Sequence, residues 1–592
     1  MRSSCSFLQS ATWLFATISL FVLLVSSQEP IEATWSSSVI GPDGPWQAVE
    51  VTIGTHGVVA LYPGNIYASW VLTTEYCSNN RSSDGCYASV AGTYNKEQGQ
   101  QLGTGTSAQI AFRPDIQDFS AGLDVQGPDT KQWMDSIDAG LQVEKVSIVL
   151  VDEQMFAYPS GQWYPAFAGC LGLGGNGQVN QSFALSANDI TNASLIPGRL
   201  WELEEIPSNS FGLHIGAVST DTPGSLWWGG YDRNRITGDI LSTDISQKDS
   251  EANFDVLLRD ISIEVVDGAS PFNFSGQSQR GLLPTTDTPL PVLVNGCSPY
   301  LSLPKSICDS VTEHLPVTYN TDLGLYLWNT ENPQYQRIVS SASALAFTLE
   351  SESDDSSKIT IRVPFTHLNL TLNKPLVAEP TPYFPCFTGA PDDSNVLGRA
   401  FMQDAFIGAN WMAQTWWLAQ APGPNFGRRS RVTAIDESDK TIQGGDEKWE
   451  ETWDNAWRVL SEDDLKDDNE SHVNEGDEED PKSEPSSEPT QTSSDDGLST
   501  GTMAGIGVGV GLALVGLIGT AIFFWLRRKR AQKQVQQQGM LGTEHNDMLQ
   551  HTGHRSLQVA DRTSKRAVSK AELYAGYEGR QDYPNMTRYE LE

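Results

Sequence analysis

The sequence predicts an all-β domain over residues 28–425, and three observations lead to this prediction. Short runs of apolar and β-favouring residues recur along this stretch, for example at 48–53 and 359–363. Gly, Pro, Asn and Asp separate the runs, and helical periodicity is scarce. The stretch also lacks a linker-like segment, so we expect two packed β lobes, about 45–240 and 241–425, rather than several small modules.

Apolar segments near the two ends predict a secreted, membrane-anchored chain. Residues 1–27 have one Arg near the start, an apolar run and small residues at the end, as in a cleaved signal peptide. Residues 502–526 form a second apolar run without charge, long enough for one transmembrane helix. Four cations, Arg527 to Arg530, follow directly. Because basic residues stay on the cytosolic side, residues 527–592 are expected to be a cytosolic tail, as in a single-pass type I protein.

The segment before this span is strongly acidic. The chain has a net charge of −36, and residues 441–500 hold twenty Asp or Glu against four Lys or Arg. We therefore predict a disordered stalk at 426–501, because such a segment cannot bury enough apolar surface to fold. Trp449, Trp453 and Trp457 share one helical face there, which suggests either a short helix docking on a partner or on the ectodomain, or a local helix in the stalk. The acidic balance argues against nucleic-acid binding.

Cysteines and glycosylation motifs agree with a lumenal location. Seven cysteines occur, and Cys5 is removed with the signal peptide. An even number remains, which suggests disulfides, although the count alone does not give the pairing. The remaining cysteines are Cys77, Cys86, Cys170, Cys297, Cys308 and Cys386. The predicted lumenal N-x-S/T sites are Asn80, Asn180, Asn192, Asn273, Asn369 and Asn469.

Metal and cofactor motifs are absent from the sequence. The His residues are scattered, without H-E-x-x-H spacing, and no C-x-x-C pair occurs. The Gly-rich string at 172–177 precedes no crossover helix, so it is expected to be a structural turn. We therefore expect neither a metal nor a cofactor.

Five local sequences, in order, are similar to motifs of the pepsin-like aspartic proteases. The resemblance covers about residues 45–422 and implies that family's bilobal fold with a cleft between the lobes. The matching pieces are Phe167-Ala-Gly-Cys-Leu-Gly-Leu-Gly174 for F-D-G-I-L-G-L-G, Ser210-Phe-Gly-Leu for S-F-x-L, Gly224-Ser-Leu-Trp-Trp-Gly-Gly-Tyr-Asp232 for G-x-L-x-x-G-G-x-D, Val396-Leu-Gly-Arg-Ala-Phe401 for I-L-G-D-x-F, and Trp416-Trp-Leu-Ala-Gln-Ala421 for the closing strand.

The resemblance also implies two site loops, each carrying one catalytic Asp in a D-T/S-G string. The two carboxylates share a proton and activate a water. Counting along this chain places the first Asp on Tyr62 or Pro63 and the second on Asn295. None of these side chains is a carboxylate, and no D-S-G or D-T-G string occurs anywhere in the chain. Deamidation of Asn295 would restore only one of the two carboxylates.

Two further family positions differ. The Asp of I-L-G-D is Arg399 here, and the Tyr of the flap over the cleft corresponds to Leu102. The resemblance therefore predicts a protease fold without protease chemistry.

The resemblance implies one disulfide and places two further cysteines at the site loops. The family has a small disulfide after the first site loop, where Cys77 and Cys86 lie. Cys170 occupies the Ile slot beside the first site loop, and Cys297 occupies the Gly slot of the second. We expect a Cys170–Cys297 bridge across the lobes, which leaves Cys308 to pair with Cys386. The alternative for the central pair is two free buried thiols.

Three functions remain open from the sequence. The first is a non-catalytic cell-surface glycoprotein that binds a peptide, glycan or protein partner through the retained cleft. The second is a membrane-anchored aspartic endopeptidase, and the third is a structural surface glycoprotein. The plasma membrane is the expected location, with the vacuolar or endosomal membrane as alternatives. Gly505-x-x-x-Gly509 in the span would permit a homodimer.

Overall fold

The computed structural model describes residues 28–466, except 56, 68, 80–84, 99–102, 106–123, 175–179, 187–188, 246–253, 284–287, 352–356 and 391–394. The predicted signal peptide, transmembrane span and cytosolic tail lie outside the described residues, as do Asn80, Leu102, Asn469 and the stalk beyond 466. None of the described helices is long and apolar enough to cross a bilayer.

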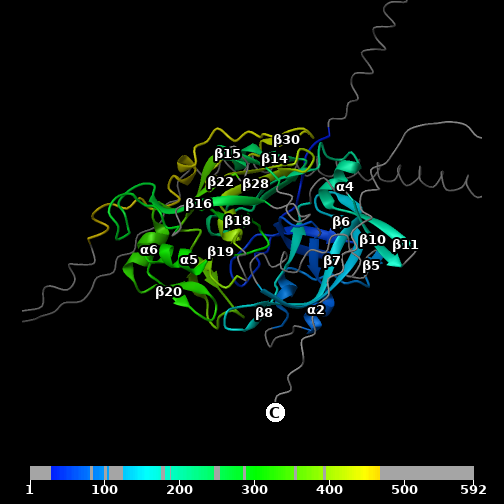
Figure 1. Ribbon diagram of the computed structural model, residues 1–592, viewed down its shortest axis with the longest axis horizontal. Coiled ribbons are helices and arrows are strands. Elements are labelled where there is room, and N and C mark those ends of the chain that lie inside the picture. The colour runs from blue at the N-terminus through cyan, green and yellow to red at the C-terminus, as the bar shows by residue number, and fades with distance from the viewer. Residues whose placement is uncertain are drawn as a thin grey trace, which may run out of the picture. The chain divides into compact units, whose positions relative to one another are not determined.

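Strands dominate the described chain, which confirms the all-β prediction. The first half of the chain, blue to cyan in Figure 1, builds one large sheet of mixed direction. In spatial order it contains β10 (Asn180–Ser186), β11 (Asp189–Ser194), β7 (Gln142–Ala157), β4 (Ser69–Leu72), β9 (Gly169–Gly172), β3 (Gly57–Gly64), β2 (Val49–Ile53), β6 (Asp124–Asp138) and β5 (Gly103–Gly105), with β8 (Trp163–Pro165) paired to β7.

The second half, green in Figure 1, builds a corresponding sheet and a smaller one. The large sheet contains β23 (Lys358–Pro364), β22 (Ser343–Glu350), β16 (Asp255–Val265), β18 (Leu290–Val294), β27 (Val396–Leu397), β19 (Leu301–Ser302) and β26 (Cys386–Phe387), with β17 (Ser278–Gln279) paired to β16. The small sheet contains β20 (Val317–Asn320), β21 (Leu325–Trp328), β25 (Thr381–Phe384) and β24 (Leu370–Leu372).

A third sheet takes strands from both halves. It contains β1 (Ile31–Glu32), β13 (Ser225–Trp228), β12 (Ser210–His214), β28 (Ala405–Asn410), β29 (Thr415–Gln420) and β15 (Thr237–Asp244). The predicted lobe boundary at 240/241 is therefore wrong, because it cuts β15. Hydrogen bonds between β12 and β28, and between β15 and β29, join the two halves through this sheet.

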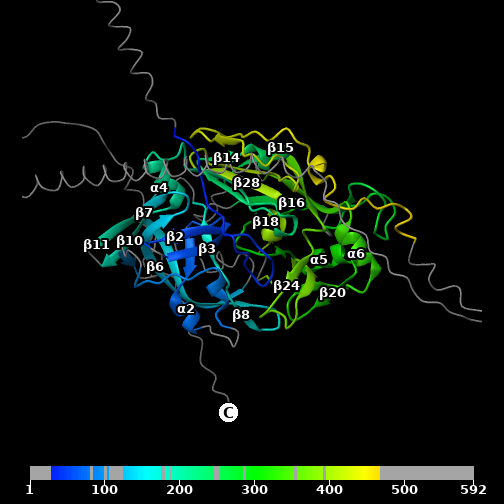
Figure 2. The ribbon, with the colours of Figure 1, turned by 180° about the vertical axis from the view of Figure 1, so that it is seen from behind.

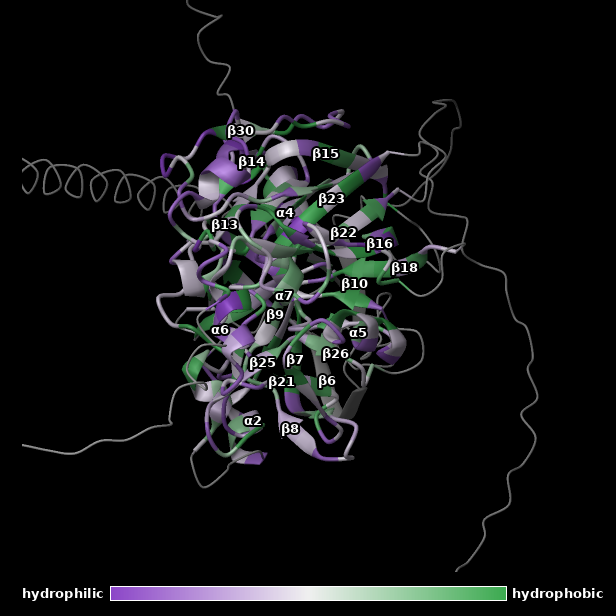
Figure 3. Cartoon of the chain, turned by 90° about the vertical axis from the view of Figure 1, so that its left-hand side faces the viewer, coloured by the Kyte–Doolittle hydropathy of each residue, from purple (hydrophilic) through white to green (hydrophobic). Residues whose placement is uncertain are grey.

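Aromatic packing explains why this central sheet forms. Every residue of β28 and β29 is buried, as expected for strands covered on both faces. Phe254 stacks between Trp411 and Trp416, with ring centroids 5.5 and 5.0 Å away. Strand β18, which is rich in Leu and Val, is coloured as hydrophobic (green) in Figure 3. Burial of such large rings is the main favourable term in the packing of the lobes.

Helices are few and short among the described residues. The longest are α5 and α6, with eight residues each, and α5 follows Pro304 and buries Ile307, Cys308 and Val311. The helices are α2 (Thr74–Asn79), α4 (Ile196–Glu202), α5 (Lys305–Thr312), α6 (Pro333–Ser340) and α7 (Arg399–Met402), with 3-10 turns at Tyr87–Val90, Val218–Thr220, Arg233–Arg235 and Glu450–Trp453.

Residues 426–466 form a strap that packs on the domain, so the prediction of a disordered stalk from residue 426 is wrong for this part. Figures 1 and 2 show the strap in yellow, running past β14, β15 and β28. It begins with β30 (Val432–Ala434), which pairs with β14 (Gly230–Asp232). Further along, Ala342 N donates to Arg458 O at 3.2 Å, and Ala269 N donates to Leu460 O at 2.7 Å.

Tryptophan side chains hold the strap in place. Trp453 is fully buried, and its ring fills the space next to Gly423 that a β-carbon would occupy. Trp449 is buried beside it, and Trp457 stacks on Trp453 at 5.1 Å. Docking of the Trp segment on the ectodomain is thus confirmed, but the segment forms a single 3-10 turn rather than an α-helix. The composition of the segment predicts disorder because charged residues are abundant, but burial of a few tryptophan rings is enough to hold the segment on the domain.

We predict that Trp453→Ala destabilises the domain by about 3–5 kcal/mol, because the substitution removes a fully buried ring and leaves a cavity. Val459→Ala is the matched control, since Val459 is about half exposed, and its effect should stay within about 0.5 kcal/mol. Chemical denaturation of the purified chain measures both values. Equal effects of the two substitutions would contradict the docking of the strap.

Candidate functional site

Each lobe carries the same three-strand arrangement at its centre. In the first lobe, β3 runs parallel to β9, and β9 runs antiparallel to β4. In the second lobe, β18 runs parallel to β27, and β27 runs antiparallel to β19. The loops after β3 and β18 are therefore equivalent, and they are the two site loops expected from the sequence.

The strand registers identify the equivalent residues in these loops. Gly172 and Gly398 close the equivalent Leu-Gly pairs of the two lobes. In the first lobe, Gly64 lies opposite Gly172. In the second, Val294 lies opposite Leu397, so the next residue, Asn295, takes the place opposite Gly398.

The first catalytic slot is therefore Gly64, and its placement on Tyr62 or Pro63 is wrong. Pro63 and Tyr62 lie one and two residues earlier, within β3. Without a D-T-G string, the sequence could not fix the length of the loop between the slot and Trp70. The second slot, Asn295, agrees with the expectation.

A disulfide fills the space between the two slots. Cys170 and Cys297 are bonded, with their Cα atoms 5.8 Å apart, which confirms the expected bridge across the lobes. A β-carbon on Gly64 would overlap Cys297 Sγ, and it would lie 2.7 Å from Asn295 Oδ1 and 2.8 Å from Cys170 Sγ. Any side chain at Gly64 would therefore displace the bridge.

Asn295 cannot replace the missing acid–base pair. Its side chain is buried, and Oδ1 accepts a hydrogen bond from Cys297 N at 3.0 Å. An amide has no proton to exchange in this role, and Gly64 has no side chain. The place where two carboxylates would share a proton therefore holds an amide and a disulfide.

Arg399 lies beside this centre and ties the second site loop to the first lobe. It begins α7, and its Nη1 donates to Gly296 O at 2.9 Å and to Cys297 O at 3.0 Å. The guanidinium lies over the Tyr62 ring at 3.8 Å, a cation–π contact. Burial raises the pKa of the Tyr62 hydroxyl above its ordinary value, so Tyr62 stays neutral.

Asp43 is the carboxylate nearest to Arg399, with Oδ1 3.9 Å from Nη2. Trp46 Nε1 donates to the same oxygen at 2.8 Å. Burial raises the pKa of Asp43 above its ordinary value, and the Arg399 charge partly opposes that rise. Nothing in the sequence had indicated Asp43 or Trp46, because Arg399, which both contact, lies more than 350 residues away in the chain.

A small cavity opens above the bridge between the lobes, and we call it the aromatic pocket. Its volume is about 50 Å³, and Cys170, Cys297, Asp43 and Arg399 line part of it. Small-molecule sites usually have several hundred Å³, so this pocket has room for the end of a molecule but not for a chain that passes through the cleft. The aromatic walls come from Tyr62, Trp70, Phe156, Tyr158, Tyr164 and Phe167.

The other predicted residues are spread over the surface and the core. Cys77 bonds to Cys86 and Cys308 bonds to Cys386, as expected. Asn180 and Asn192 lie on the hairpin of β10 and β11, Asn273 is exposed, and Asn369 is half-buried. Among the described residues, no cluster of three or more His, Cys, Asp or Glu is placed to hold a metal ion.

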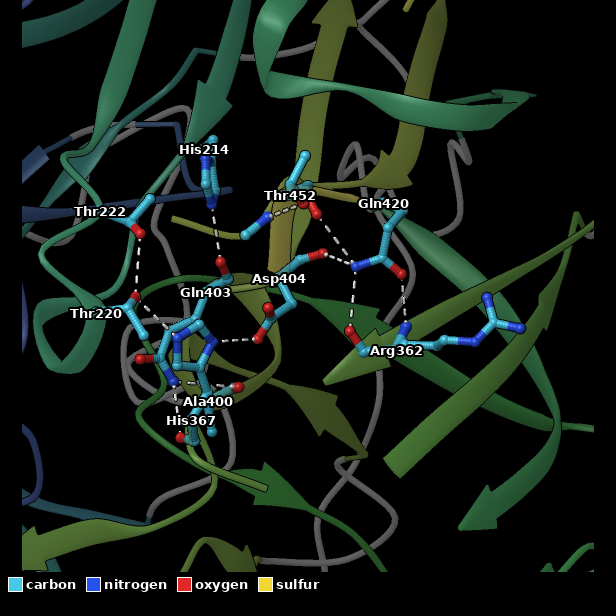
Figure 4. A network of polar contacts seen from close by, with 12 residues as sticks. His214, Thr220, Thr222, Arg362, His367, Ala400, Gln403, Asp404, Gln420 and Thr452 are labelled. Atoms are coloured by element: carbon cyan, nitrogen blue, oxygen red, sulfur yellow. Dashed lines mark hydrogen bonds and ion pairs between the residues drawn. The ribbon is translucent and has the colours of Figure 1, made fainter. Parts of the chain in front are cut away.

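A second polar cluster joins the two halves beneath the strap, as Figure 4 shows. His367 Nδ1 lies 2.8 Å from Asp404 Oδ2, and Thr220 Oγ1 lies 3.1 Å from His367 Nε2. A hydroxyl, an imidazole and a carboxylate in this order resemble a hydrolase triad. His367 is only 2 % exposed, however, and the Trp453 ring lies edge-on to its imidazole at 5.1 Å. A substrate cannot reach the imidazole, so the cluster is structural.

His214 extends this cluster from β12. Its Nε2 lies 2.8 Å from Gln403 O, and Arg235 Nη1 approaches its Nδ1 at 3.4 Å. Nε2 therefore carries the proton and Nδ1 accepts, so the ring is neutral. Burial, assisted by the Arg235 charge, lowers the pKa of His214 to about 3.

Comparisons with known proteins found a matching family model and similar proteins. The family model described as "Eukaryotic aspartyl protease" matches residues 70–421. Rhizopuspepsin-4 of Rhizopus niveus is 26 % identical over 307 residues, which cover 51 % of this chain and 64 % of that protein. The chain thus matches less than two thirds of the length of that relative. The crystal structure of the aspartic proteinase from Irpex lacteus aligns with a TM-score of 0.40 at 13 % identity, covering 66 % of this chain and 97 % of that one.

We predict that His214 makes the fold less stable as the pH falls from about 6.5 to about 3. Over that range the unfolded chain protonates His214, whose ordinary pKa is 6.5, while the folded chain, with a pKa of about 3, does not. The free energy of unfolding therefore falls by up to about 1.4 kcal/mol per pH unit from this group.

His214→Gln tests the effect, because Gln can still donate to Gln403 O but does not titrate. The difference in unfolding free energy between the parent chain and the variant should shift in favour of the variant with acidification, while contributions from other groups cancel. A difference independent of pH would mean that His214 is already protonated in the fold.

Proposed function

Because the chain belongs to the eukaryotic aspartyl protease family, we propose that it is a non-catalytic member that binds a partner rather than cleaving a substrate. The partner is a peptide, a glycan or another protein, and it is held at the cleft between the lobes. A membrane-anchored endopeptidase is the competing function, and it needs two carboxylates that face each other.

The observation that carries this proposal is the content of the two catalytic slots. Gly64 and Asn295 occupy them, and the Cys170–Cys297 bridge fills the space between. Substitution of one residue would not restore the dyad, because a carboxylate at position 64 would collide with the bridge.

The disulfide between the two lobes favours ligand binding over catalytic turnover. The Cys170–Cys297 bridge closes a loop of 127 residues across the lobes, which restricts opening and closing of the cleft. Catalysis in a cleft commonly needs such motion, whereas a preorganised surface binds with a smaller entropic cost. The aromatic pocket then offers a fixed recognition element.

We also propose that the chain acts at the cell surface as a single-pass type I glycoprotein. The signal-like segment 1–27, the apolar run 502–526 and the basic residues after it support this orientation. Three disulfides in the described part fit an oxidising compartment. The vacuolar or endosomal membrane would satisfy the same observations.

The purified full chain in detergent should not cleave denatured protein at any pH between about 3 and 7, the range in which an aspartic dyad titrates. An active pepsin assayed in the same detergent is the positive control. Cys170→Ser with Cys297→Ser is the informative variant, because it removes the clamp without adding a carboxylate and should remain inactive.

Cleavage blocked by a transition-state inhibitor of aspartic proteases would overturn the proposal. Cleavage that appears only in the double variant would show that the clamp, rather than the missing carboxylates, suppresses activity.

A further inference from the structure

Arg399 lines the aromatic pocket, and one edge of its guanidinium donates no hydrogen bond to the described residues. Nη1 is occupied by the carbonyls of Gly296 and Cys297. Nε has no hydrogen-bond partner among the described residues, although Arg399 is 97 % buried at 3 % exposure. Nη2 lies 3.9 Å from Asp43 Oδ1, which is too long for a hydrogen bond. Among the described residues, the edge formed by Nε and Nη2 therefore makes no short contact with an acceptor, and its only ionic neighbour is Asp43 at 3.9 Å.

That edge is the one with which arginine binds a carboxylate in two parallel hydrogen bonds. The same protein shows the arrangement at its surface, where Arg259 donates from Nε and Nη2 to the two oxygens of Glu350 at 2.5 and 3.1 Å. A buried guanidinium without such an acceptor is costly, so an acceptor arriving with a ligand would be favoured.

Asp43 does not fill this role within the chain. Its Oδ1 accepts from Trp46 Nε1 at 2.8 Å and lies 3.9 Å from Arg399 Nη2, beyond hydrogen-bond distance. Burial raises the pKa of Asp43, so acidification reduces the negative charge that an incoming anion meets. Burial also raises the pKa values of Tyr62 and Tyr158, so these two side chains in the pocket wall stay neutral.

The shape of the pocket selects the end of a molecule. The Cys170–Cys297 bridge closes its floor, and the volume of about 50 Å³ admits only a terminal group. Aromatic side chains such as Trp70, Phe156 and Phe167 form its walls, so the group next to the anion must be apolar. An extended chain passing through the cleft would satisfy neither condition.

We propose that the aromatic pocket binds an apolar carboxylate, with the carboxylate on the Nε–Nη2 edge of Arg399 and the apolar group against the aromatic walls. The carboxylate is either the C-terminus of a peptide that ends in an apolar residue or a small free acid. This inference rests on the proposed binding function and specifies the chemistry of its ligand.

The test compares matched acids and amides on the full chain in detergent. The peptide probe is a hexapeptide mixture with Leu fixed at the C-terminus, prepared as the free acid and as the amide. The small probe is 4-methylpentanoate with its amide. The acid should bind at least about tenfold more tightly than the amide, which corresponds to about 1.4 kcal/mol. If only the peptide binds more tightly as the acid than as the amide, the ligand is a peptide C-terminus. If 4-methylpentanoate also binds more tightly than its amide, a small free acid is sufficient for binding.

Three variants separate recognition from stability. Arg399→Gln should remove the preference for the acid, while Arg280→Gln, at an exposed arginine, should leave it unchanged. Asp43→Asn should strengthen acid binding, because it removes the neighbouring negative charge and keeps an oxygen for Trp46. If Arg399→Gln fails to fold, the acid–amide comparison and Asp43→Asn still decide the matter.

Equal binding of acid and amide to the parent chain would overturn carboxylate recognition and leave the binding function standing. Weaker acid binding by Asp43→Asn would overturn it as well. Failure of every probe to bind, as acid or amide, would count against this inference and against binding of peptides at the cleft, whereas absence of proteolysis would be unaffected.

Discussion

The Cys170–Cys297 bridge is the constraint on which the rest of the site depends. It joins β9 of the first lobe to the loop after β18 of the second, at the point where the two site loops face each other. Its sulfur atoms leave no room for a side chain at position 64, so glycine is the residue that the first loop can hold there. A carboxylate side chain at position 64 would collide with the bridge, and both cysteines of the bridge line the aromatic pocket.

Arg399 shows how the surroundings of the centre have adapted. In active relatives this motif position carries an Asp, as the resemblance implies, whereas here a guanidinium binds the carbonyls of the second loop and stacks on Tyr62. The two site loops are held together by a disulfide and a buried cation. The result is a rigid junction between the lobes with a charged, partly unsatisfied group at the edge of a small aromatic pocket.

Much of this could be predicted from the sequence, for a definite physical reason. Motifs such as Phe167–Gly174 and Val396–Phe401 encode the paired strands at the centre of each lobe, so their order predicted the fold and placed Cys170 opposite Cys297. The slot at Gly64 was misplaced because no local pattern fixed the length of its loop. Composition predicts disorder from residue 426 because it averages over charges and does not register how deeply Trp453 is buried, whereas the spacing of the tryptophans already indicated docking on the ectodomain as one alternative. Asp43 gave no signal at all, since its role depends on a contact with a residue far away in the chain.

The most direct test of this account is the connectivity of Cys170 and Cys297 in the native protein. Digestion of the alkylated, unreduced full chain followed by mass spectrometry should yield a peptide pair joined through these two cysteines, which separates on reduction. Recovery of Cys170 or Cys297 as an alkylated free thiol from the native protein would contradict the account, because the catalytic centre would then be open between Gly64 and Asn295.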